Sequence, residues 1–370
     1  MKSTLSGMRK QVLEYVKSHP ILSLSLLITL LYIVFTICLG LYTKNVVPSN
    51  IAATANYPYE VTNSLNSFAK WDSRFYLSIA KYGYLESVHT AFFPLYPLLG
   101  SIVSYFVGSY LLGAALVSWA SLVFAVYFYL KIVSRLFRLK KLEDYIIAAC
   151  LFLFFPTAVF SVGVYTESLF AALALGAIYF ALQKRPVWAV GFAAFACTTR
   201  LNGLFLLLFV LLLLLEAKYQ LRKIIMYGLA GLIPLGMYMV FLMKEFGNPL
   251  QFLVAEKAWN RFGSNYFATL GDTVSAVSVL GFLLLMASVW YFVKRKRWSY
   301  VIYLMLYALT PLISGNFDGF SRYILMAFPL HWMVLEVLRR YKALYGPVLA
   351  VYAALWCYYL IQFVGGYTGG

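Results

Sequence analysis

The sequence predicts an all-α polytopic membrane protein, on three observations. Of its 370 residues, 63% are hydrophobic and only 12% are charged, whereas about a quarter of the residues in soluble domains are charged. Apolar runs long enough to cross a hydrocarbon core of about 30 Å as helices recur from Ile21 almost to the end of the chain. Short clusters of Lys and Arg separate these runs, as in the cytoplasmic loops of membrane proteins. We therefore expect one integral membrane domain over residues 1–370.

The basic clusters set the topology of the predicted spans. Placed on the cytoplasmic side, they leave room for about eleven transmembrane helices, with the amino terminus inside and the carboxyl terminus outside. The clusters lie at Lys2 to Lys17, Lys131 to Lys141, Lys184 and Arg185, Lys218 to Lys223, Lys294 to Arg297 and Arg339 to Lys342. The spans are predicted to begin near Ile21, Leu111, Tyr145, Ser168, Val187, Leu201, Ile224, Val274, Tyr300, Tyr323 and Leu344.

The net charge of +17 is explained by these loop clusters, so we expect no nucleic-acid partner. The cysteines lie within apolar runs without the spacing of metal ligands, and we expect them to be unreactive packing residues. No Asp-rich or His-rich run indicates a metal centre, although a divalent cation held by Asp72, Glu167 or Asp318 stays an open alternative. We expect no other cofactor.

Residues 43–110 form the predicted first extracytoplasmic loop, and they contain two expected interfacial helices. In "FAKWDSRFYLSIAKYGY", the aromatic and aliphatic spacing predicts one helical face, with Ser67 capping the start and Gly83 ending the helix. The stretch from Phe92 to Val107 does not fit the alternation of spans, so we interpret it as a re-entrant or interfacial helix. The first of these helices carries Asp72 near its start, where a carboxylate either complements the helix dipole or takes part in chemistry.

The predicted topology places most polar residues outside the basic clusters on the extracytoplasmic face. Each has a structural alternative. Glu167 is a first-turn helix acid or faces a sugar or cation, and Arg200 either reaches to the membrane surface or binds a phosphate. Asp318 and Arg322, four apart, pair with each other on a helix or belong to the site. Glu256 and Lys257 lie on a long outer loop, and His89 is the histidine predicted on this face, whereas His19 and His331 have interfacial and packing positions.

An ordered series of short strings resembles the PIG-V family of mannosyltransferases. The strings are "WDSRFYLSIAKYGY", "HTAFFPLYPLL", "VYTESLF" and "TTRLNGL", followed more weakly by "GNPLQFLVAEKAW" and "FDGFSRY". Together they cover the chain from Lys70 to about Leu330. The chain departs from the pattern at Phe75, where some relatives have a histidine, and it is shorter than the eukaryotic members, which leaves the acceptor open.

The resemblance implies a GT-C type glycosyltransferase fold with its active site on the non-cytoplasmic side. It implies a sugar donor carried on a polyprenyl phosphate, mannose as the sugar, a lipid-linked or extracytoplasmic glycan as the acceptor, and Asp72 as the catalytic base. The expected location is the cell membrane in a prokaryote or the endoplasmic reticulum membrane in a eukaryote, with membrane lipids as neighbours. The rival interpretation is a transporter or lipid flippase, because polar residues within membranes often mark a transport path.

The sequence thus gives a set of candidate site residues. Asp72 is the predicted general base of an inverting transfer. The predicted substrate-binding residues are Arg74, His89, Glu167, Arg200, Asn202, Glu256, Lys257, Asp318 and Arg322.

Overall fold

The computed structural model describes residues 18–48, 64–261 and 275–367, and all regular structure in these residues is helical. Among these described residues, five helices are long and apolar enough to cross a membrane. They are α2 (Pro20–Val46), α5 (Tyr110–Phe137), α10 (Leu221–Phe246), α13 (Ala276–Lys294) and α17 (Tyr345–Gly365). The predicted all-α polytopic membrane fold is confirmed. The basic cluster from Lys2 to Lys17 and the expected span start at Val274 lie outside the described residues.

The other predicted spans coincide with shorter helices. These are α6 (Leu142–Leu153), α7 (Glu167–Leu182), α8 (Pro186–Ala196), α9 (Gly203–Glu216), α14 (Trp298–Ser314) and the broken pair α15 (Phe320–Leu325) and α16 (Phe328–Arg340). At about 1.5 Å per residue, α8 and α9 rise only about 16 and 21 Å. Both are shorter than a hydrocarbon core of about 30 Å. The connection between α8 and α9 therefore lies inside the depth of the bundle.

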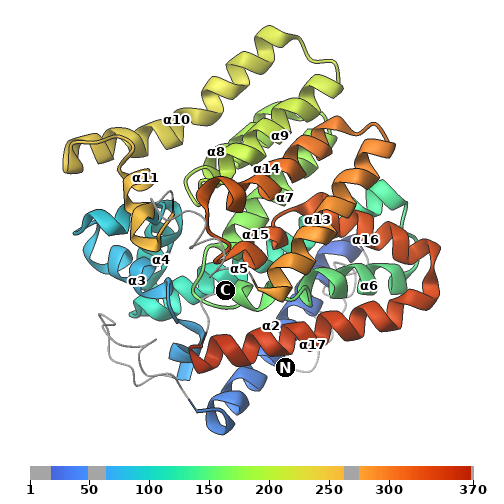
Figure 1. The fold of residues 1–370 in the computed structure, drawn as a ribbon, viewed down its shortest axis with the longest axis horizontal. Helices are drawn as coiled ribbons and strands as arrows, with labels where there is room; N and C mark the ends of the chain where they lie inside the picture. The colour runs from blue at the N-terminus through green and yellow to red at the C-terminus, as the bar shows by residue number, and fades with distance from the viewer. Residues whose placement is uncertain (1–17, 49–63, 262–274, 368–370) are drawn as a thin grey trace, which may run out of the picture.

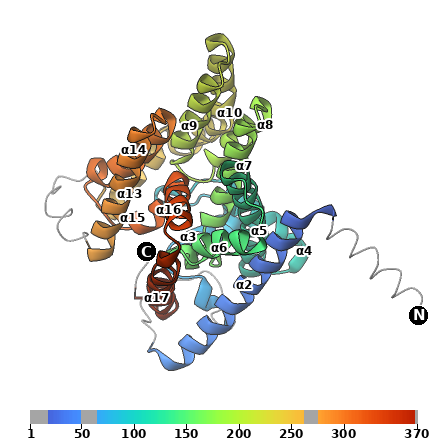
Figure 2. The same ribbon diagram turned by 90° about the vertical axis from the view of Figure 1, so that its right-hand side faces the viewer.

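The bundle is organised around α5 and α7 (Figures 1 and 2). Helix α5 packs against α2 and α7, and α7 packs in turn against α8 and α9. The contact between α7 and α8 is close because Gly176 has no side chain: an added Cβ would lie 2.5 Å from the ring of Phe192. Helix α10 lies at the edge of the bundle in both views, beside α8 and α9.

The segment between α2 and α5 contains η2 (Ser64–Phe68), α3 (Ser73–Tyr82), η3 (Ser87–Ala91) and α4 (Leu95–Val107). Helix α4 is 13 residues long, rises about 20 Å and packs against α5. The turn between α4 and α5 requires a glycine at position 108, because Gly108 has φ +71°, in the left-handed region that glycine adopts readily.

The predicted start of the amphipathic helix is wrong. Trp71 adopts φ +52°, which a right-handed helix does not allow, so α3 begins at Ser73 with Asp72 as its N-cap, and Ser67 lies in η2. The predicted end is confirmed, because Gly83 follows the helix with φ +76°. Helix α3 packs against α4 and α5, so its buried face contacts protein.

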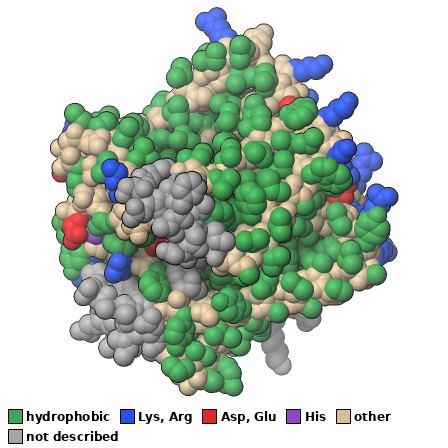
Figure 3. All heavy atoms as spheres, viewed as in Figure 1, with side chains coloured by type: hydrophobic (Ala, Val, Ile, Leu, Met, Phe, Trp, Pro, Cys, Tyr) green, Lys and Arg blue, Asp and Glu red, His purple; other side chains and the backbone are tan. Residues whose placement is uncertain are grey.

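The surface shows two opposed ends separated by an apolar zone. Lys and Arg side chains lie along the upper and right margins in Figure 3, the side on which the connections α9–α10, α13–α14 and α16–α17 turn in Figure 1. Apolar side chains cover the broad surface next to this margin. Helices α3 and α11 (Gln251–Ala255) lie at the opposite end.

Candidate active site

Four charged residues from four distant segments form one continuous chain of ion contacts. Asp72 precedes α3, Glu167 is the first residue of α7, Arg200 lies in the α8–α9 connection and Arg322 lies in α15. We call this set the ion-pair chain. All four were predicted from the sequence to lie on one face, and the structure brings them together.

Acidic and positively charged side chains alternate along the ion-pair chain. Arg322 Nη2 lies 3.0 Å from Asp72 Oδ2, and Arg322 Nε lies 3.7 Å from Glu167 Oε1. The same oxygen, Glu167 Oε1, accepts a hydrogen bond of 2.8 Å from Arg200 Nη1. The two ends of the chain are the more accessible members, since the side chains of Asp72 and Arg200 are 25% and 13% exposed, against 0% for Glu167 and 9% for Arg322.

Backbone contacts fix Asp72 next to the start of α7. Ser73 Oγ donates to the carbonyl oxygen of Val164 at 2.9 Å, and Val164 N donates to the carbonyl oxygen of Phe68 at 2.9 Å. The hydroxyl of Tyr165 donates to the carbonyl oxygen of Lys70 at 2.9 Å. The carboxylate of Asp72 makes no capping bond to its own helix, so its ion pair with Arg322 and not a capping role explains its position.

Buried polar atoms without partners lie in the middle of this chain. In the described part of the molecule, Glu167 Oε2, Arg322 Nε and Arg322 Nη1 have no hydrogen-bond partner. A buried charged group that lacks a full set of hydrogen bonds costs folding free energy. Three such atoms on two residues in contact show that the hydrogen bonding of this polar cluster is incomplete.

Arg200 is held by the start of α7. Its Nη1 donates to Thr166 Oγ1 at 3.0 Å as well as to Glu167, and the hydroxyl of Tyr76 lies 3.4 Å from the same Thr166 oxygen. The Glu167 carboxylate, 2.8 Å from Arg200 Nη1, balances the charge of this guanidinium. Arg200 is therefore a fixed cation at one end of the site.

Aromatic rings lie beside the guanidinium groups of Arg200 and Arg322. The guanidinium of Arg322 lies 5.3 Å from the ring of Phe160 and 5.1 Å from the ring of Tyr165. The guanidinium of Arg200 lies 5.3 Å from the ring of Tyr323. These distances are within the range of cation–π attraction, which stabilises a cation without neutralising it.

A second cluster adjoins the ion-pair chain through Tyr323. Arg261 Nη1 lies 2.7 Å from Glu256 Oε2, and Arg261 Nη2 donates to the Tyr323 hydroxyl at 2.8 Å. Tyr323 thus contacts Arg261 with its hydroxyl and Arg200 with its ring. The sequence indicated Glu256, but nothing in it identified Tyr323, which falls where a transmembrane span was predicted to begin.

Asp318 and Arg322 do not pair with each other, so the structure excludes the helical pair, which was one of the two alternatives for these residues. Gly319 adopts φ +74° and α15 begins only at Phe320, so Asp318 lies outside the helix and the i, i+4 geometry does not exist. The side chain of Asp318 is exposed, and its backbone nitrogen donates to Asn316 Oδ1 at 2.6 Å.

The remaining predicted residues lie outside the ion-pair chain. Arg74 is exposed, with its guanidinium 4.5 Å from the Phe75 ring, and Lys257 is exposed in η5 (Glu256–Trp259). Asn202 is the N-cap residue of α9, with its carbonyl oxygen accepting from the first helical turn. His89 is buried and packs edge-on against Phe75 at 6.0 Å. Burial lowers the pKa of its imidazole, with Glu86 opposing the shift.

Comparison with known proteins places these residues in a family. The sequence matches the family model for Mannosyltransferase (PIG-V) over residues 9–245, which include Asp72, Glu167 and Arg200. The chain is 32% identical over 213 residues to the GPI alpha-1,6-mannosyltransferase 2 of Homo sapiens, covering 53% of this chain and 41% of that protein. It is 29% identical over 216 residues to the protein of the same name in Cricetulus griseus, covering 54% and 42%.

The chain thus spans less than half the length of these curated relatives. No solved structure matches it. The family match covers well over half of the sequence and agrees with the ordered motifs. This chain belongs to the PIG-V mannosyltransferase family.

Proposed function

We propose that this protein transfers mannose from a polyprenyl phosphate to a hydroxyl of a lipid-linked or extracytoplasmic glycan. Its family is one of mannosyltransferases, and the relatives it matches are named for transfer of mannose in α-1,6 linkage. The donor, the acceptor class and the direction of attack are our proposal. The observation that carries it is the ion-pair chain with a carboxylate at one accessible end and a guanidinium at the other.

The two ends suit the two charges that develop in such a transfer. An acceptor hydroxyl must lose a proton as it attacks, and the phosphate leaves with an electron pair. Asp72 accepts the hydroxyl proton, the acceptor oxygen bonds to the anomeric carbon, and the bond from that carbon to the phosphate oxygen breaks. A single displacement of this kind inverts the anomeric configuration. Arg200 binds the leaving phosphate through its planar set of donors.

Arg322 and Glu167 position the two ends. Arg322 Nη2 lies 3.0 Å from Asp72 Oδ2 and holds this carboxylate in place for a role as general base. Glu167 holds both arginines through one oxygen and leaves Oε2 for a substrate hydroxyl. Arg322 Nη1 likewise has no hydrogen-bond partner among the described residues. Removal of any one member therefore disturbs the other three.

We place the site on the extracytoplasmic side of the membrane. The connections rich in Lys and Arg turn together at one end of the bundle, and α3, which follows Asp72, lies at the other end. Under the positive-inside rule the first end is cytoplasmic. The polyprenyl-phosphate donor then reaches the site from the outer part of the bilayer.

A donor panel tests the proposal. The purified protein in lipid nanodiscs is supplied with polyprenyl phosphates carrying mannose, glucose, galactose or arabinose, together with lipid and glycan acceptors. We expect release of polyprenyl phosphate with the mannose donor and a product of inverted anomeric configuration by NMR. Retention of configuration would contradict the single displacement. Movement of the intact donor across a bilayer, with no release of polyprenyl phosphate, would support a flippase instead.

A further inference from the structure

Tyr323 contacts two guanidinium groups that come from different parts of the chain. The centroid of its ring lies 5.3 Å from the guanidinium carbon of Arg200, and its hydroxyl accepts a hydrogen bond of 2.8 Å from Arg261 Nη2. The other five residues of α15 are buried, whereas Tyr323 is half-buried. Tyr323 is therefore the side chain of α15 that joins Arg200 to the outer segment 256–261.

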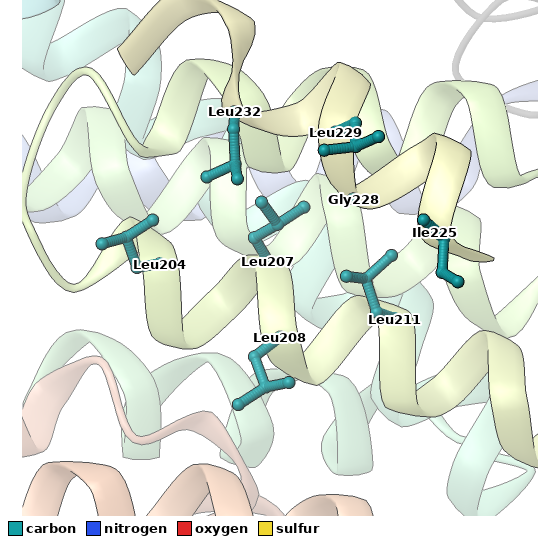
Figure 4. A pocket seen from close by; sticks show the side chains of 8 residues that line it. All are labelled: Leu204, Leu207, Leu208, Leu211, Ile225, Gly228, Leu229 and Leu232. Carbon is teal, nitrogen blue, oxygen red and sulfur yellow. The ribbon is translucent and has the colours of Figure 1, made fainter. Parts of the chain in front are cut away.

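The hydrogen bonds of Arg200 hold its guanidinium at one nitrogen. Both of its side-chain hydrogen bonds to the described residues, one to Thr166 and one to Glu167, leave from Nη1. The first two turns of α9, which follow Arg200, are apolar, and the α9 side chains that face α10 are leucines (Figure 4). A group bonded at one nitrogen can still rotate about that nitrogen, and the contact with the Tyr323 ring restrains this rotation.

Tyr323 is in turn oriented by the segment 256–261. Arg261 donates to its hydroxyl through Nη2, while Arg261 Nη1 lies 2.7 Å from Glu256 Oε2. The backbone of the segment is attached to the loop before α15, where Asn316 Nδ2 donates to the carbonyl oxygen of Trp259 at 2.9 Å. The position of the Tyr323 hydroxyl therefore depends on the position of this segment.

The same segment also reaches the helix that follows Asp72. The ring of Trp259 lies 5.8 Å from the ring of Phe75 and 5.6 Å from the ring of Phe92. Phe75 is in the first turn of α3, three positions after Asp72. No residue of η5 is buried, so these ring contacts and hydrogen bonds hold the segment in place. The segment thus contacts the helix beside Asp72 and the tyrosine beside Arg200.

We propose that Tyr323 is a positioning residue, which orients Arg200 toward the donor phosphate and is itself oriented by Arg261. The inference rests on the proposed function, in which Arg200 binds that phosphate. Tyr323 contacts the arginine and not the reacting atoms, so it acts through Arg200. A guanidinium held against an aromatic ring stays charged and keeps its remaining donors for phosphate oxygens. Because its orientation is set before the donor arrives, less ordering is required on binding.

Tyr323→Leu tests the contact between the ring and Arg200. We expect this variant to raise the KM for polyprenyl phosphate mannose about threefold to tenfold, because the guanidinium must then be ordered when the donor binds. In an Arg200→Ala background, the same substitution should raise the KM no further. An equal rise with and without Arg200 would show that Tyr323 acts on the donor or on the fold directly, and would overturn the proposal.

Tyr323→Phe tests the part played by Arg261, because it keeps the ring and removes the hydroxyl. Its KM should lie between those of the wild type and Tyr323→Leu, and Arg261→Gln should give the same value. The double variant should have the KM of either single variant, since both remove one hydrogen bond. Additive effects would show that Arg261 acts on the donor without Tyr323, and would contradict the proposal.

Tyr291→Leu is the matched control for the loss of a ring beside an arginine. Tyr291 is also half-buried, its ring lies 4.0 Å from the guanidinium carbon of Arg295, and its hydroxyl accepts a hydrogen bond from that arginine. This pair lies at the end of α13 that leads into the basic connection to α14. The control should have the wild-type KM, with melting temperatures recorded for every variant. A rise equal to that of Tyr323→Leu would show a general effect of ring removal on the bundle and overturn the proposal.

Binding of polyprenyl phosphate without sugar separates this inference from the proposed function. Titration of each variant in nanodiscs should show weaker binding for Tyr323→Leu only where Arg200 is present. If the wild type binds polyprenyl phosphate but transfers no mannose, the proposed function fails and this pattern still decides the role of Tyr323. If mannose transfer proceeds and Tyr323→Leu binds and reacts as the wild type does, the positioning role fails and the proposed function stands. A wild type that binds no polyprenyl phosphate would overturn both.

Discussion

Asp72 and Arg322 form an ion pair of 3.0 Å although they are 250 positions apart in the sequence. The pair joins the start of α3, in the loop between the first two long helices, to α15 near the carboxyl-terminal end. A contact between such distant segments is specified by the whole fold. It presents a carboxylate at an accessible position beside a buried cation.

Glu167→Gln should destabilise the protein strongly. Glu167 is fully buried and contacts both Arg200 and Arg322, so its loss leaves two largely buried guanidiniums without their shared carboxylate. Breaking a buried ion pair in this way costs about 3–5 kcal/mol. Denaturation in detergent, followed by tryptophan fluorescence or thermal scanning, measures the change.

The matched control for this variant is Glu336→Gln. Glu336 pairs with Arg295, and both side chains are more than a third exposed. An exposed pair of this kind contributes about 0–1 kcal/mol. Equal losses in the two variants would show that Glu167 has no special structural role.

Arg200→Ala should weaken donor binding more than it slows the bound donor's reaction. Its guanidinium is the accessible cation of the site, and hydrogen bonds to charged groups contribute about 1.5–3 kcal/mol each. We therefore expect the KM for the donor to rise about tenfold to a hundredfold. Arg222→Ala, at the exposed start of α10, removes a positive charge far along the chain from the site and should leave the KM unchanged. Equal KM values for wild type and Arg200→Ala would remove Arg200 from the phosphate site.

Acidification should destabilise the protein partly through His89. Burial lowers the pKa of its imidazole below the value of about 6.5 in an unfolded chain. Between the lowered folded pKa and about 6.5, the unfolded chain binds more protons than the folded one. Stability therefore rises with pH in this window and falls as the pH drops through it.

His89→Gln should reduce this pH dependence, because the amide does not titrate. The measurement compares melting temperatures of wild type and variant at pH 7.5 and pH 5.5. His19→Gln, which changes an exposed histidine, should behave as the wild type. A His89→Gln variant that loses as much stability on acidification as the wild type would show that other groups account for the effect.

Sequence patterns predicted the all-α membrane fold and the location of the four charged residues on one face. Both predictions depend on how a bilayer separates apolar segments from basic loops. Long apolar runs and basic loops fix which segments face each side. Residues as far apart as Asp72 and Arg322 were therefore expected on one face before any distance was known.

The pairing within the site was not predictable from local patterns. The spacing of Asp318 and Arg322 indicated a helical pair, but the backbone turns at Gly319 and separates them. The spacing of aromatic and aliphatic residues in the first loop predicted a helix capped by Ser67. Trp71 instead adopts a left-handed conformation just before Asp72, so the helix begins later. Both errors concern a single backbone angle, which hydrophobic periodicity does not report. The contact of Tyr323 with Arg261 depends on tertiary packing and has no local signal.

We propose that Asp72 is the general base and does not serve mainly to hold the fold or the donor. The direct measurement compares Asp72→Asn with Glu86→Gln, which makes the same carboxylate-to-amide change at an exposed position of the same loop. For each variant, release of polyprenyl phosphate from the mannose donor is measured beside donor binding and melting temperature.

With Asp72 as the general base, Asp72→Asn should bind the donor and release polyprenyl phosphate at least about a hundredfold more slowly, while Glu86→Gln retains the wild-type rate. Turnover of Asp72→Asn at the wild-type rate would show that Asp72 is not the general base.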